Sequence, residues 1–380
     1  MIRRAKATAL WVLMALLLNG CWDSKTIQDV NYLTAIGFDL IDGQYAVYVQ
    51  MLDFSSVAKT EQGKAAQEVP TWVGNSTGET LGVALNKLYR TSQMRIFYGH
   101  VNVVVLGKGI IEKNAAKDPR ELLARYYEMR YTPWLFGTKG DIKELFTAGS
   151  FFNYPPLISL LHQPNETYLQ ESLIPPMKLV KFAAEFREPS NSVLVPSVVL
   201  SKASWQSGGT PKPMFLEDGC FVFQNKVYQG WFRMEELYGL RWFNPETKRS
   251  PLIIRSHNGK PMVVLSLESP KVTIQPLINK DKVAFSLNVT LTGIVSEALL
   301  PLSEPDLQRK AEEQVQAEIR QTYEKGLKRD TDLLRLEHEL YRKNNQVWKR
   351  LRSREDFHLT SESLQIHVHV NMKHAQKLKY

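Results

Sequence analysis

The sequence contains little cysteine and no long apolar run. Two of its 380 residues are cysteines, Cys21 and Cys220, which excludes the disulfide framework typical of small secreted domains. The uncharged apolar run over residues 7–18 is too short for a helix that crosses a bilayer, which needs about 20 residues. Other apolar runs, such as residues 101–106, have the length of strands. We therefore expect no segment of this chain to span a membrane.

Motifs that mark common chemistry are missing as well. The sequence has no P-loop, no Rossmann glycine fingerprint, no His-Glu-x-x-His and no Cys-x-x-Cys. It also has no arginine-rich tract and no nucleic-acid-binding motif. These absences predict a protein with no catalytic centre, cofactor, metal ion or nucleic-acid partner. The formal charge of +9 fits a mildly basic solvated surface, or a position beside an anionic lipid surface.

The first residues have the pattern of a bacterial lipoprotein signal. Three basic residues precede the apolar run, and Leu18-Asn19-Gly20-Cys21 follows it. In such signals the cysteine thiol receives a diacylglyceryl group, and the peptide in front of it is removed. Asn19 departs from the small residue that is usual at its position. The alternative is a cytosolic protein with a hydrophobic first helix. Charge, length, cleavage site and cysteine together favour a signal peptide over residues 1–20 and lipidation of Cys21.

In the rest of the chain, predicted strands tend to follow strands and predicted helices tend to follow helices. Alternating apolar residues predict strands, and apolar residues three or four apart predict amphipathic helices. The expected helices cover residues 78–90, 119–128, 141–146, 234–242, 304–326 and 330–352. The expected strands cover residues 32–38, 44–54, 71–73, 96–106, 134–138, 193–200, 219–225, 226–232, 252–255, 262–267, 271–277, 283–295 and 363–372. This order favours the α+β class.

One linker divides the chain. Residues 201–213 contain Ser207-Gly208-Gly209 and two prolines, which are typical of a connecting segment. We expect an N-terminal α+β region over residues 21–200, which a subdomain can interrupt. After the linker we expect a small β-rich middle domain over residues 214–260, and a C-terminal α+β domain with a long helix pair over residues 261–380.

The run Gly74-Asn75-Ser76-Thr77-Gly78 matches the Gly-x-Ser-x-Gly nucleophile elbow of serine hydrolases. It falls between a short predicted strand and a predicted helix, so an exported serine esterase that uses Ser76 is one alternative function. The simpler interpretation is that Ser76 or Thr77 caps the helix that begins near Gly78. We favour the cap, because the pattern is short and no glycine-rich oxyanion segment precedes it.

His367 and His369 lie two residues apart on a predicted strand, so both point to the same face, and His374 follows. Such a set binds zinc only with further ligands in suitable geometry, and two polar residues on an exposed strand face are the interpretation we favour. His100 is expected to be a packed or hydrogen-bonded strand residue. Cys220 lies in an apolar strand-like run, and we expect it to be buried in the core and not to be a nucleophile.

The ordered landmarks of the chain resemble the Ger(x)C spore germination lipoproteins. The start Gly20-Cys21-Trp22-Asp23 is the most specific landmark, and Ile36-Gly37-Phe38-Asp39 follows it. The later landmarks are the helix at residues 78–90, the run from Gly99-His100 to Gly107, Arg125-x-x-Glu128-x-Arg130, Pro196, Gly219-x-Phe221-x-Phe223, Gly230 and the closing helix-helix-strand unit. Arg125 and Glu128 are three residues apart and can pair across one helical turn. The resemblance covers nearly the whole chain after residue 20.

That family supplies the C subunits of nutrient germinant receptors in spore-forming Gram-positive bacteria. The resemblance implies three domains of mixed or antiparallel sheets flanked by helices, and no enzymatic activity. It also implies a lipid anchor at Cys21 on the outer face of the spore's inner membrane, beside two integral membrane partners, the A and B subunits. The family-motif residues that it selects are Trp22, Asp23, Gly37, Asp39, Gly99, His100, Arg125 and Glu128.

We therefore expect a non-catalytic, membrane-anchored receptor subunit that the germination response needs. A solute-binding lipoprotein of a transporter is the main alternative, and it would have two lobes of alternating strands and helices. The serine esterase is the other alternative. Neither composition nor motif identifies the nutrient or shows that this chain contacts it.

Overall fold

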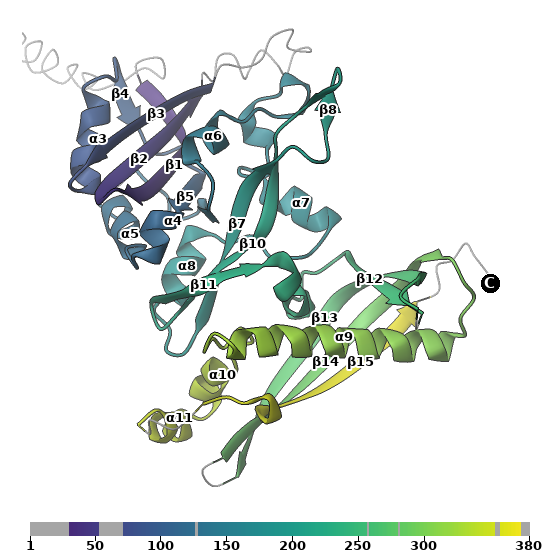
Figure 1. Cartoon of the computed structure of the whole chain (residues 1–380). Coiled ribbons are helices and arrows are strands. Elements are labelled where there is room, and N and C mark those ends of the chain that lie inside the picture. The colour runs from purple at the N-terminus through teal and green to yellow at the C-terminus, as the bar shows by residue number, and fades with distance from the viewer. Residues whose placement is uncertain are drawn as a thin grey trace, which may run out of the picture.

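The computed structural model of the chain describes residues 30–52, 71–125, 128–256, 258–279, 282–353 and 358–373. The predicted signal peptide and Cys21 lie outside these residues. Within them the chain forms three sheets with helices packed around them, a mixed α/β fold (Figure 1). The mixture of helices and sheets is therefore as the sequence predicts.

The largest sheet has nine strands in the order β11-β10-β7-β6-β5-β1-β2-β3, with β4 paired to the start of β1. β4, β5, β6 and β7 continue the direction of β1, whereas β2, β3, β10 and β11 are antiparallel to their neighbours. The parallel strands make this part of the chain less segregated than the α+β class predicts. The strands are β1 (Val30–Ile41), β2 (Gln44–Leu52), β3 (Thr71–Gly78), β4 (Arg95–Phe97), β5 (Val103–Gly107), β6 (Trp134–Thr138), β7 (Ser192–Ser201), β10 (Met214–Gln224) and β11 (Val227–Arg233).

Helices cover both faces of this sheet, and successive residues of a strand point to opposite faces. On one face, Ile36 and Val104 belong to a core that includes residues of α3, α4, α5 and α8. On the other face, Ala35 and Val103 pack with α6. The helices are α3 (Leu81–Tyr89), α4 (Lys108–Glu112), α5 (Lys117–Leu123), α6 (Ile142–Thr147), α7 (Pro164–Gln170) and α8 (Leu179–Glu185), with short 3-10 turns η2 (Phe151–Asn153) and η3 (Pro156–Ile158).

The second sheet has four strands in the order β12-β13-β14-β15. They are β12 (Ser250–Arg255), β13 (Pro261–Asn279), β14 (Lys282–Ala298) and β15 (Leu364–Lys373). Helix α9 (Glu304–Leu327) lies along one face of this sheet (Figure 1). Its buried residues recur every four positions, at Leu307, Ala311, Val315, Ile319 and Tyr323, and they pack on the buried face of β14. The long amphipathic helix from residue 304 is thus confirmed.

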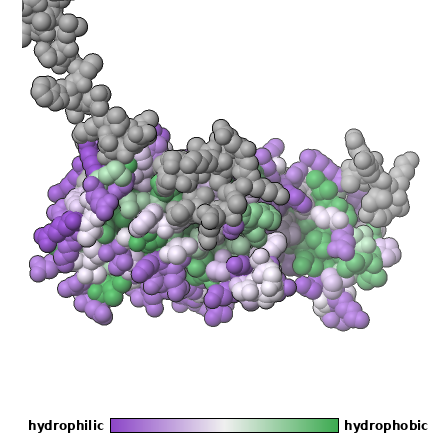
Figure 2. Space-filling view, turned by 90° about the horizontal axis from the view of Figure 1, so that it is seen from above, coloured by the Kyte–Doolittle hydropathy of each residue, from purple (hydrophilic) through white to green (hydrophobic). Residues whose placement is uncertain are grey.

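Short elements connect the two sheets. The turns η4 (Met234–Glu236) and η5 (Tyr238–Trp242) pack against α9. Helices α10 (Leu336–Lys343) and α11 (Asn345–Arg352) follow α9, and the turn η6 (Ser361–Ser363) leads into β15. The third sheet is a small hairpin of β8 (Gln206–Ser207) and β9 (Thr210–Pro211). It lies on the same side of the molecule as β4, the upper side in Figure 1, and Figure 2 views that side directly.

Residues 214–260 contribute to two sheets. Strands β10 and β11 extend the nine-stranded sheet beside β7, whereas β12 belongs to the four-stranded sheet. The predicted linker, residues 201–213, contains the β8–β9 hairpin. The division into domains over residues 21–200, 214–260 and 261–380 stays a prediction.

Three predicted strand limits are wrong. The strand expected over residues 71–73 is β3, which continues to Gly78. The expected strand over residues 96–106 is interrupted: β4 ends at Phe97, a turn at Gly99-His100 follows, and β5 begins at Val103. The expected strands over residues 262–267 and 271–277 are one strand, β13, with a register shift between Glu268 and Lys271. The positive φ of Ser269 lets the backbone accommodate the extra residue there, so pairing with β14 continues on both sides.

Two predicted helix limits are also wrong. The helix expected over residues 330–352 is divided into α10 and α11, and Asn344 separates them. The first eight residues after α9 form a connecting segment, because Arg335 has a left-handed φ of 61° and α10 begins only at Leu336. The helix expected over residues 119–128 is α5, which ends at Leu123. None of the described helices is long and apolar enough to cross a bilayer.

Candidate functional site

The structure divides the family-motif residues between the two ends of strand β1. Gly37 and Asp39 lie toward the end of β1, whereas Gly99, His100 and Glu128 lie near its start, where β4 pairs with residues 30–32. Cys21, Trp22, Asp23 and His374 lie outside the described residues. Arg125 is exposed just beyond α5.

Asp39 has a structural role at the start of helix α4. One oxygen of its carboxylate, Oδ1, accepts hydrogen bonds from the backbone N–H groups of Leu40 at 2.8 Å and Ile110 at 3.2 Å. Burial raises the pKa of this carboxyl group, which the backbone N–H groups partly offset. A Cβ atom added at Gly107 would lie 2.1 Å from Asp39 Cγ, so glycine is needed for this close approach. Asp39 thus fixes α4 to the sheet.

Gly37 serves the packing of helix α6. A Cβ atom at this position would lie 2.5 Å from Cγ2 of Ile142, at the beginning of α6. The absence of a side chain therefore lets α6 lie directly on β1. Gly37 and Asp39 together set the positions of one helix on each face of the sheet.

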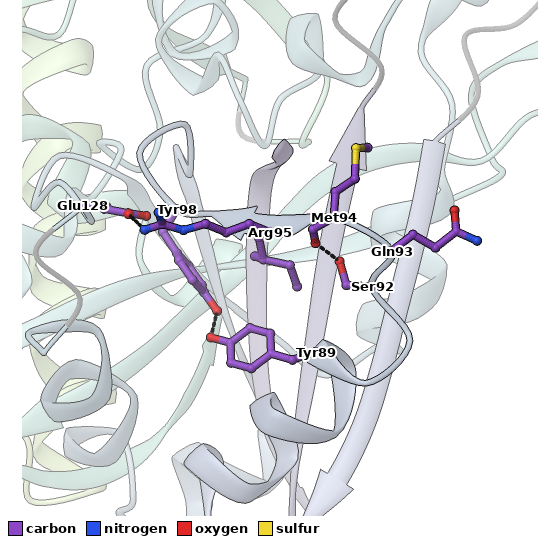
Figure 3. A pocket seen from close by; sticks show the side chains of 8 residues that line it. Tyr89, Ser92, Gln93, Met94, Arg95, Tyr98 and Glu128 are labelled. Carbon is purple, nitrogen blue, oxygen red and sulfur yellow. Dashed lines mark hydrogen bonds and ion pairs between the residues drawn. The ribbon is translucent and has the colours of Figure 1, made fainter. Parts of the chain in front are cut away.

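At the start of β1 a cavity of about 530 Å³ opens beside β4 (Figure 3). It is built from the end of α3, the loop that follows it, β4, and the segment after α5. Its side chains are mainly aromatic, apolar and paired polar groups. The lining residues are Tyr89, Ser92, Gln93, Met94, Arg95, Ile96, Tyr98 and Glu128.

Two polar contacts connect the walls of this cavity. The guanidinium of Arg95 lies 2.5 Å from the Glu128 carboxylate, an ion pair between β4 and the segment after α5. The hydroxyl groups of Tyr89 and Tyr98 are hydrogen-bonded at 2.5 Å. Figure 3 shows both pairs directed across the cavity. Three separate parts of the chain are therefore held together around it.

The turn at Gly99-His100 belongs to the same end of the sheet. The His100 ring is exposed and packs edge-on against Tyr32 with the ring centroids 4.9 Å apart, and Tyr32 packs in the same way against Phe97 at 5.7 Å. His100 is thus a packed residue as predicted, but it lies in a turn and not in a strand. A Cβ atom at Gly99 would lie 2.5 Å from the Phe97 ring, which explains the glycine.

The pair predicted between Arg125 and Glu128 stays a prediction, but the helix on which it was based is shorter than expected. Helix α5 ends at Leu123, before both residues, and the Glu128 carboxylate pairs with Arg95 of β4. Sequence reasoning missed Arg95, Tyr89 and Tyr98 altogether. The sequence feature that could have pointed to this site is the position of Tyr98 directly before the Gly99-His100 landmark.

The nucleophile-elbow pattern at Ser76 is not an elbow in the structure. Ser76 lies within strand β3, opposite Val47 of β2, and its hydroxyl donates a hydrogen bond to the carbonyl oxygen of Ala84. An elbow needs the serine on the turn between strand and helix, where its oxygen is exposed. The predicted cap is also wrong, since Thr80 caps α3 by accepting a hydrogen bond from Val83 N–H at 3.2 Å.

The two histidines of β15 are exposed, as predicted for a solvent-facing strand position. His369 Nδ1 lies 3.2 Å from Glu312 Oε1 of α9, and the same oxygen accepts the N–H of Val370 at 3.0 Å. Within the described ranges, no group of three or more His, Cys, Asp or Glu side chains is arranged to hold a metal ion. Cys220 is fully buried, which confirms its predicted place in the core, and burial raises the pKa of its thiol.

The chemistry of the cavity beside β4 fits recognition. Its carboxylate is neutralised by a guanidinium, its phenols are hydrogen-bonded to each other, and Ser92 Oγ donates to the Met94 carbonyl oxygen at 2.6 Å. These contacts engage polar groups that line the cavity with one another. What the cavity residues offer is a concave surface with an apolar floor and a charged rim.

These features define a class, a mixed α/β protein in which a nine-stranded sheet is joined to a four-stranded one. A solved structure described as the GerBC protein has this fold: it matches 89% of this chain and 96% of its own with a TM-score of 0.56 and 14% sequence identity. Residues 23–200 match the family described as spore germination protein N-terminal domain. Residues 218–376 match the family described as spore germination B3/GerAC like, C-terminal.

Curated relatives extend over much of the chain. Spore germination protein KC of Bacillus subtilis (strain 168) is 21% identical over 369 residues, which is 93% of this chain and 91% of that protein. Spore germination protein B3 of the same organism is 22% identical over 300 residues, 78% of this chain and 76% of the relative. The chain belongs to the GerAC/GerKC family of spore germination proteins, the C subunits of germinant receptors.

Proposed function

We propose that this protein is a non-catalytic, lipid-anchored subunit of a spore nutrient germinant receptor, acting through contacts with integral membrane A and B subunits. Membership of the germinant-receptor family supports the receptor role. The Leu18-Asn19-Gly20-Cys21 pattern supports the anchor, and the lipid on Cys21 holds the chain on the outer face of the membrane. No cofactor and no nucleic acid enters this function.

One observation supports a contact role for the cavity beside β4. The cavity lies where β1 begins, and the strand pairing of Val30 with Arg95 places its rim next to the first described residue. Val30 is nine positions after Cys21, a distance along the chain that reaches at most about 32 Å when fully extended. The exposed rim residues Arg95 and Met94 are therefore close to the bilayer, within reach of the extracellular loops of membrane partners.

The solute-binding alternative requires two lobes of similar construction on either side of a cleft. The two large sheets of this chain differ in strand number and order, nine strands against four. The esterase alternative requires Ser76 on an exposed turn, and Ser76 lies in strand β3. Neither alternative has an observation in its favour.

Germination of a deletion strain tests the proposed function. Spores that lack this chain are expected to lose the response to particular nutrients while they keep the response to a non-nutrient trigger. Complementation with the natural sequence should restore the response, and complementation with the Cys21→Ala variant should not, because the protein is released from the membrane. Full nutrient responses in the deletion strain and full function of Cys21→Ala would each contradict part of the proposal.

A further inference from the structure

Four aromatic side chains form an exposed group away from the cavity. They are Phe151, Phe152, Tyr154 and Trp205, here called the aromatic cluster. Phe152 is 84% exposed and Trp205 is 55% exposed, values that are unusual for such large apolar groups. The rings are nevertheless in contact, since Phe151 and Trp205 pack edge-on with centroids 4.9 Å apart, and Phe152 lies within 6.2 Å of Tyr154.

The backbone holds the aromatic cluster in this exposed position. Phe152 and Asn153 both have left-handed φ values, 56° and 60°, which L-residues adopt only where the surroundings impose them. Trp205 is held at the base of the β8–β9 hairpin, where its carbonyl oxygen accepts a hydrogen bond from Lys212 N–H at 2.8 Å. Exposure of these rings is therefore built into the fold.

The two chain segments that carry the aromatic cluster also have a distinctive charge. Residues 145–165 contain no Asp, Glu, Lys or Arg. Residues 201–216 contain two lysines, Lys202 and Lys212, both exposed, and no acidic residue. Aromatic rings with a few lysines and no carboxylate match the interfacial zone of a bilayer, where rings lie at headgroup level and lysines contact anionic lipid.

The segments that carry the aromatic cluster reach the side of the molecule where β1 begins. Helix α6 brings Phe146 beside the first half of β1. The Phe146 carbonyl oxygen accepts a hydrogen bond from Gln50 Nε2 at 2.8 Å, and Gln50 pairs with Ala35 of β1. Figure 1 shows the start of β1, β4 and the β8 hairpin together on one side, and Figure 2 views that side. Trp72, 67% exposed, lies near the same end of the sheet, opposite Met51.

We propose that the aromatic cluster inserts into the interfacial zone of the bilayer to which Cys21 is attached. This inference rests on the proposed lipid anchor and adds a second point of attachment to it. One attachment point lets the protein tilt freely, whereas two points far apart on one side fix which face it presents to membrane partners. The rim of the cavity beside β4 is then held in a constant orientation toward the A and B subunits.

A fluorescent label tests the insertion. Cys21 carries the lipid and Cys220 is fully buried, so a cysteine introduced by Phe152→Cys is the accessible thiol for an NBD label. The lipidated full chain is reconstituted in vesicles of phosphatidylglycerol and phosphatidylethanolamine, with and without bromine on the acyl chains. The matched control is Leu277→Cys, at an exposed apolar residue near the end of β13, on the opposite side in Figure 1.

Loss of most NBD emission in brominated vesicles at position 152, with little loss at position 277, is the expected result. Equal and weak quenching at both positions would overturn the insertion. Quenching at neither position, with a change at 152 only when the A and B subunits are present, would also overturn it and assign the cluster to a protein contact. Flotation separates the two proposals: a chain that does not float with vesicles lacks the anchor, whereas a floating chain without quenching lacks only the insertion.

Discussion

The two large sheets bury their apolar residues in different ways. In the nine-stranded sheet, β5 reads Val-Val-Val-Leu-Gly and all five residues are buried, because helices cover both faces. In the four-stranded sheet, β14 alternates buried and less buried residues for most of its length, because α9 covers one face only. Packing of helices on the nine-stranded sheet therefore requires close approach of backbones. Packing of α9 on the four-stranded sheet requires only that one sheet face is apolar.

This difference determines where motifs are found. Two of the residues that the family resemblance selects, Gly37 and Asp39, lie in strand β1 of the nine-stranded sheet, where they set the positions of α6 and α4. In the four-stranded sheet the apolar period alone is enough to position α9, so many sequences satisfy it. The following predictions test this comparison, from the largest expected effect to the smallest.

The four-stranded half should depend most on one buried ion pair. Arg241 of η5 is 5% exposed, and its guanidinium lies 2.8 Å from the Glu318 carboxylate of α9. The same carboxylate accepts a hydrogen bond from the indole Nε1–H of Trp242 at 2.9 Å. Glu318→Ala leaves a buried charge without its partner, which costs about 3–5 kcal/mol. Urea unfolding measures the change in the free energy of unfolding.

The matched control for this pair is Glu313→Ala on the exposed side of α9. Glu313 pairs with Arg309 at 2.9 Å, and both side chains are exposed. An exposed pair contributes at most about 1 kcal/mol, so the control should unfold almost as the natural chain does. Equal destabilisation by both variants would mean that burial of Arg241 is not what makes its pair important.

The nine-stranded half should be most sensitive at Gly107. In Gly107→Ala the new Cβ meets the Asp39 carboxyl, and the resulting displacement should cost about 1–3 kcal/mol of unfolding free energy. Gly82→Ala is the control, because a Cβ there meets nothing closer than Thr80 Oγ1 at 3.9 Å and alanine favours the helix. A lower midpoint of thermal unfolding for Gly82→Ala than for Gly107→Ala would contradict the explanation by close packing at Gly107.

Two buried groups, His162 beside the nine-stranded sheet and Asp332 beside the four-stranded sheet, should contribute opposite pH dependences to stability. His162 is buried between Gln50 Oε1 at 3.0 Å and Asn102, and burial lowers its pKa to about 3. The imidazole has an ordinary pKa of about 6.5 in the unfolded chain, so on acidification it is protonated there before it is protonated in the folded chain. The free energy of unfolding therefore falls as the pH decreases from about 6.5 toward 3. In His162→Gln the free energy of unfolding should fall less between about pH 6.5 and pH 3 than in the natural chain. The same fall in both chains would contradict this assignment.

Asp332, between α9 and α10, should give the opposite dependence. Burial, with the charge of Glu337 nearby, raises its pKa to about 7, so the folded chain holds a proton that the unfolded chain has released. Its contribution to stability is therefore present at low pH and is lost as the pH rises from about 4 through 7. Asp332→Asn keeps an oxygen for the Glu337 N–H, 2.8 Å away, and should reduce the loss. Equal pH profiles of the two chains would contradict this assignment.

The smallest effect on stability is expected at the cavity beside β4. Glu128→Gln removes the ion pair with Arg95 but keeps a side chain of the same size, and the half-exposed Arg95 guanidinium stays in contact with water, so the free energy of unfolding should change by about 1 kcal/mol. If the cavity rim contacts receptor partners, the nutrient response of spores should nevertheless slow. Glu112→Gln, which removes an exposed pair with Lys108, is the control with no expected effect on germination. Equal germination in both would exclude the rim from the contact.

Elements were predictable where a local pattern is sufficient. The period of four in α9 and the alternation in β15 follow from burial on one face, and both were found as predicted. The β4–β5 interruption was not predictable, since residues 96–106 are apolar throughout much of their length and only the turn at Gly99-His100 breaks the pairing. Ser76 shows the converse, because a five-residue pattern does not contain the strand pairing that places it in β3.

The sequence by itself determined the mixture of strands and helices, the burial of Cys220 and the family, because these depend on the order of apolar, small and charged residues along the chain. Only the tertiary structure decided that Glu128 pairs with Arg95, 33 residues away, and that His162 contacts Gln50, 112 residues away. It also decided that Phe151 packs on Trp205. Such contacts depend on how strands order themselves in a sheet, and local propensities carry no information about that order.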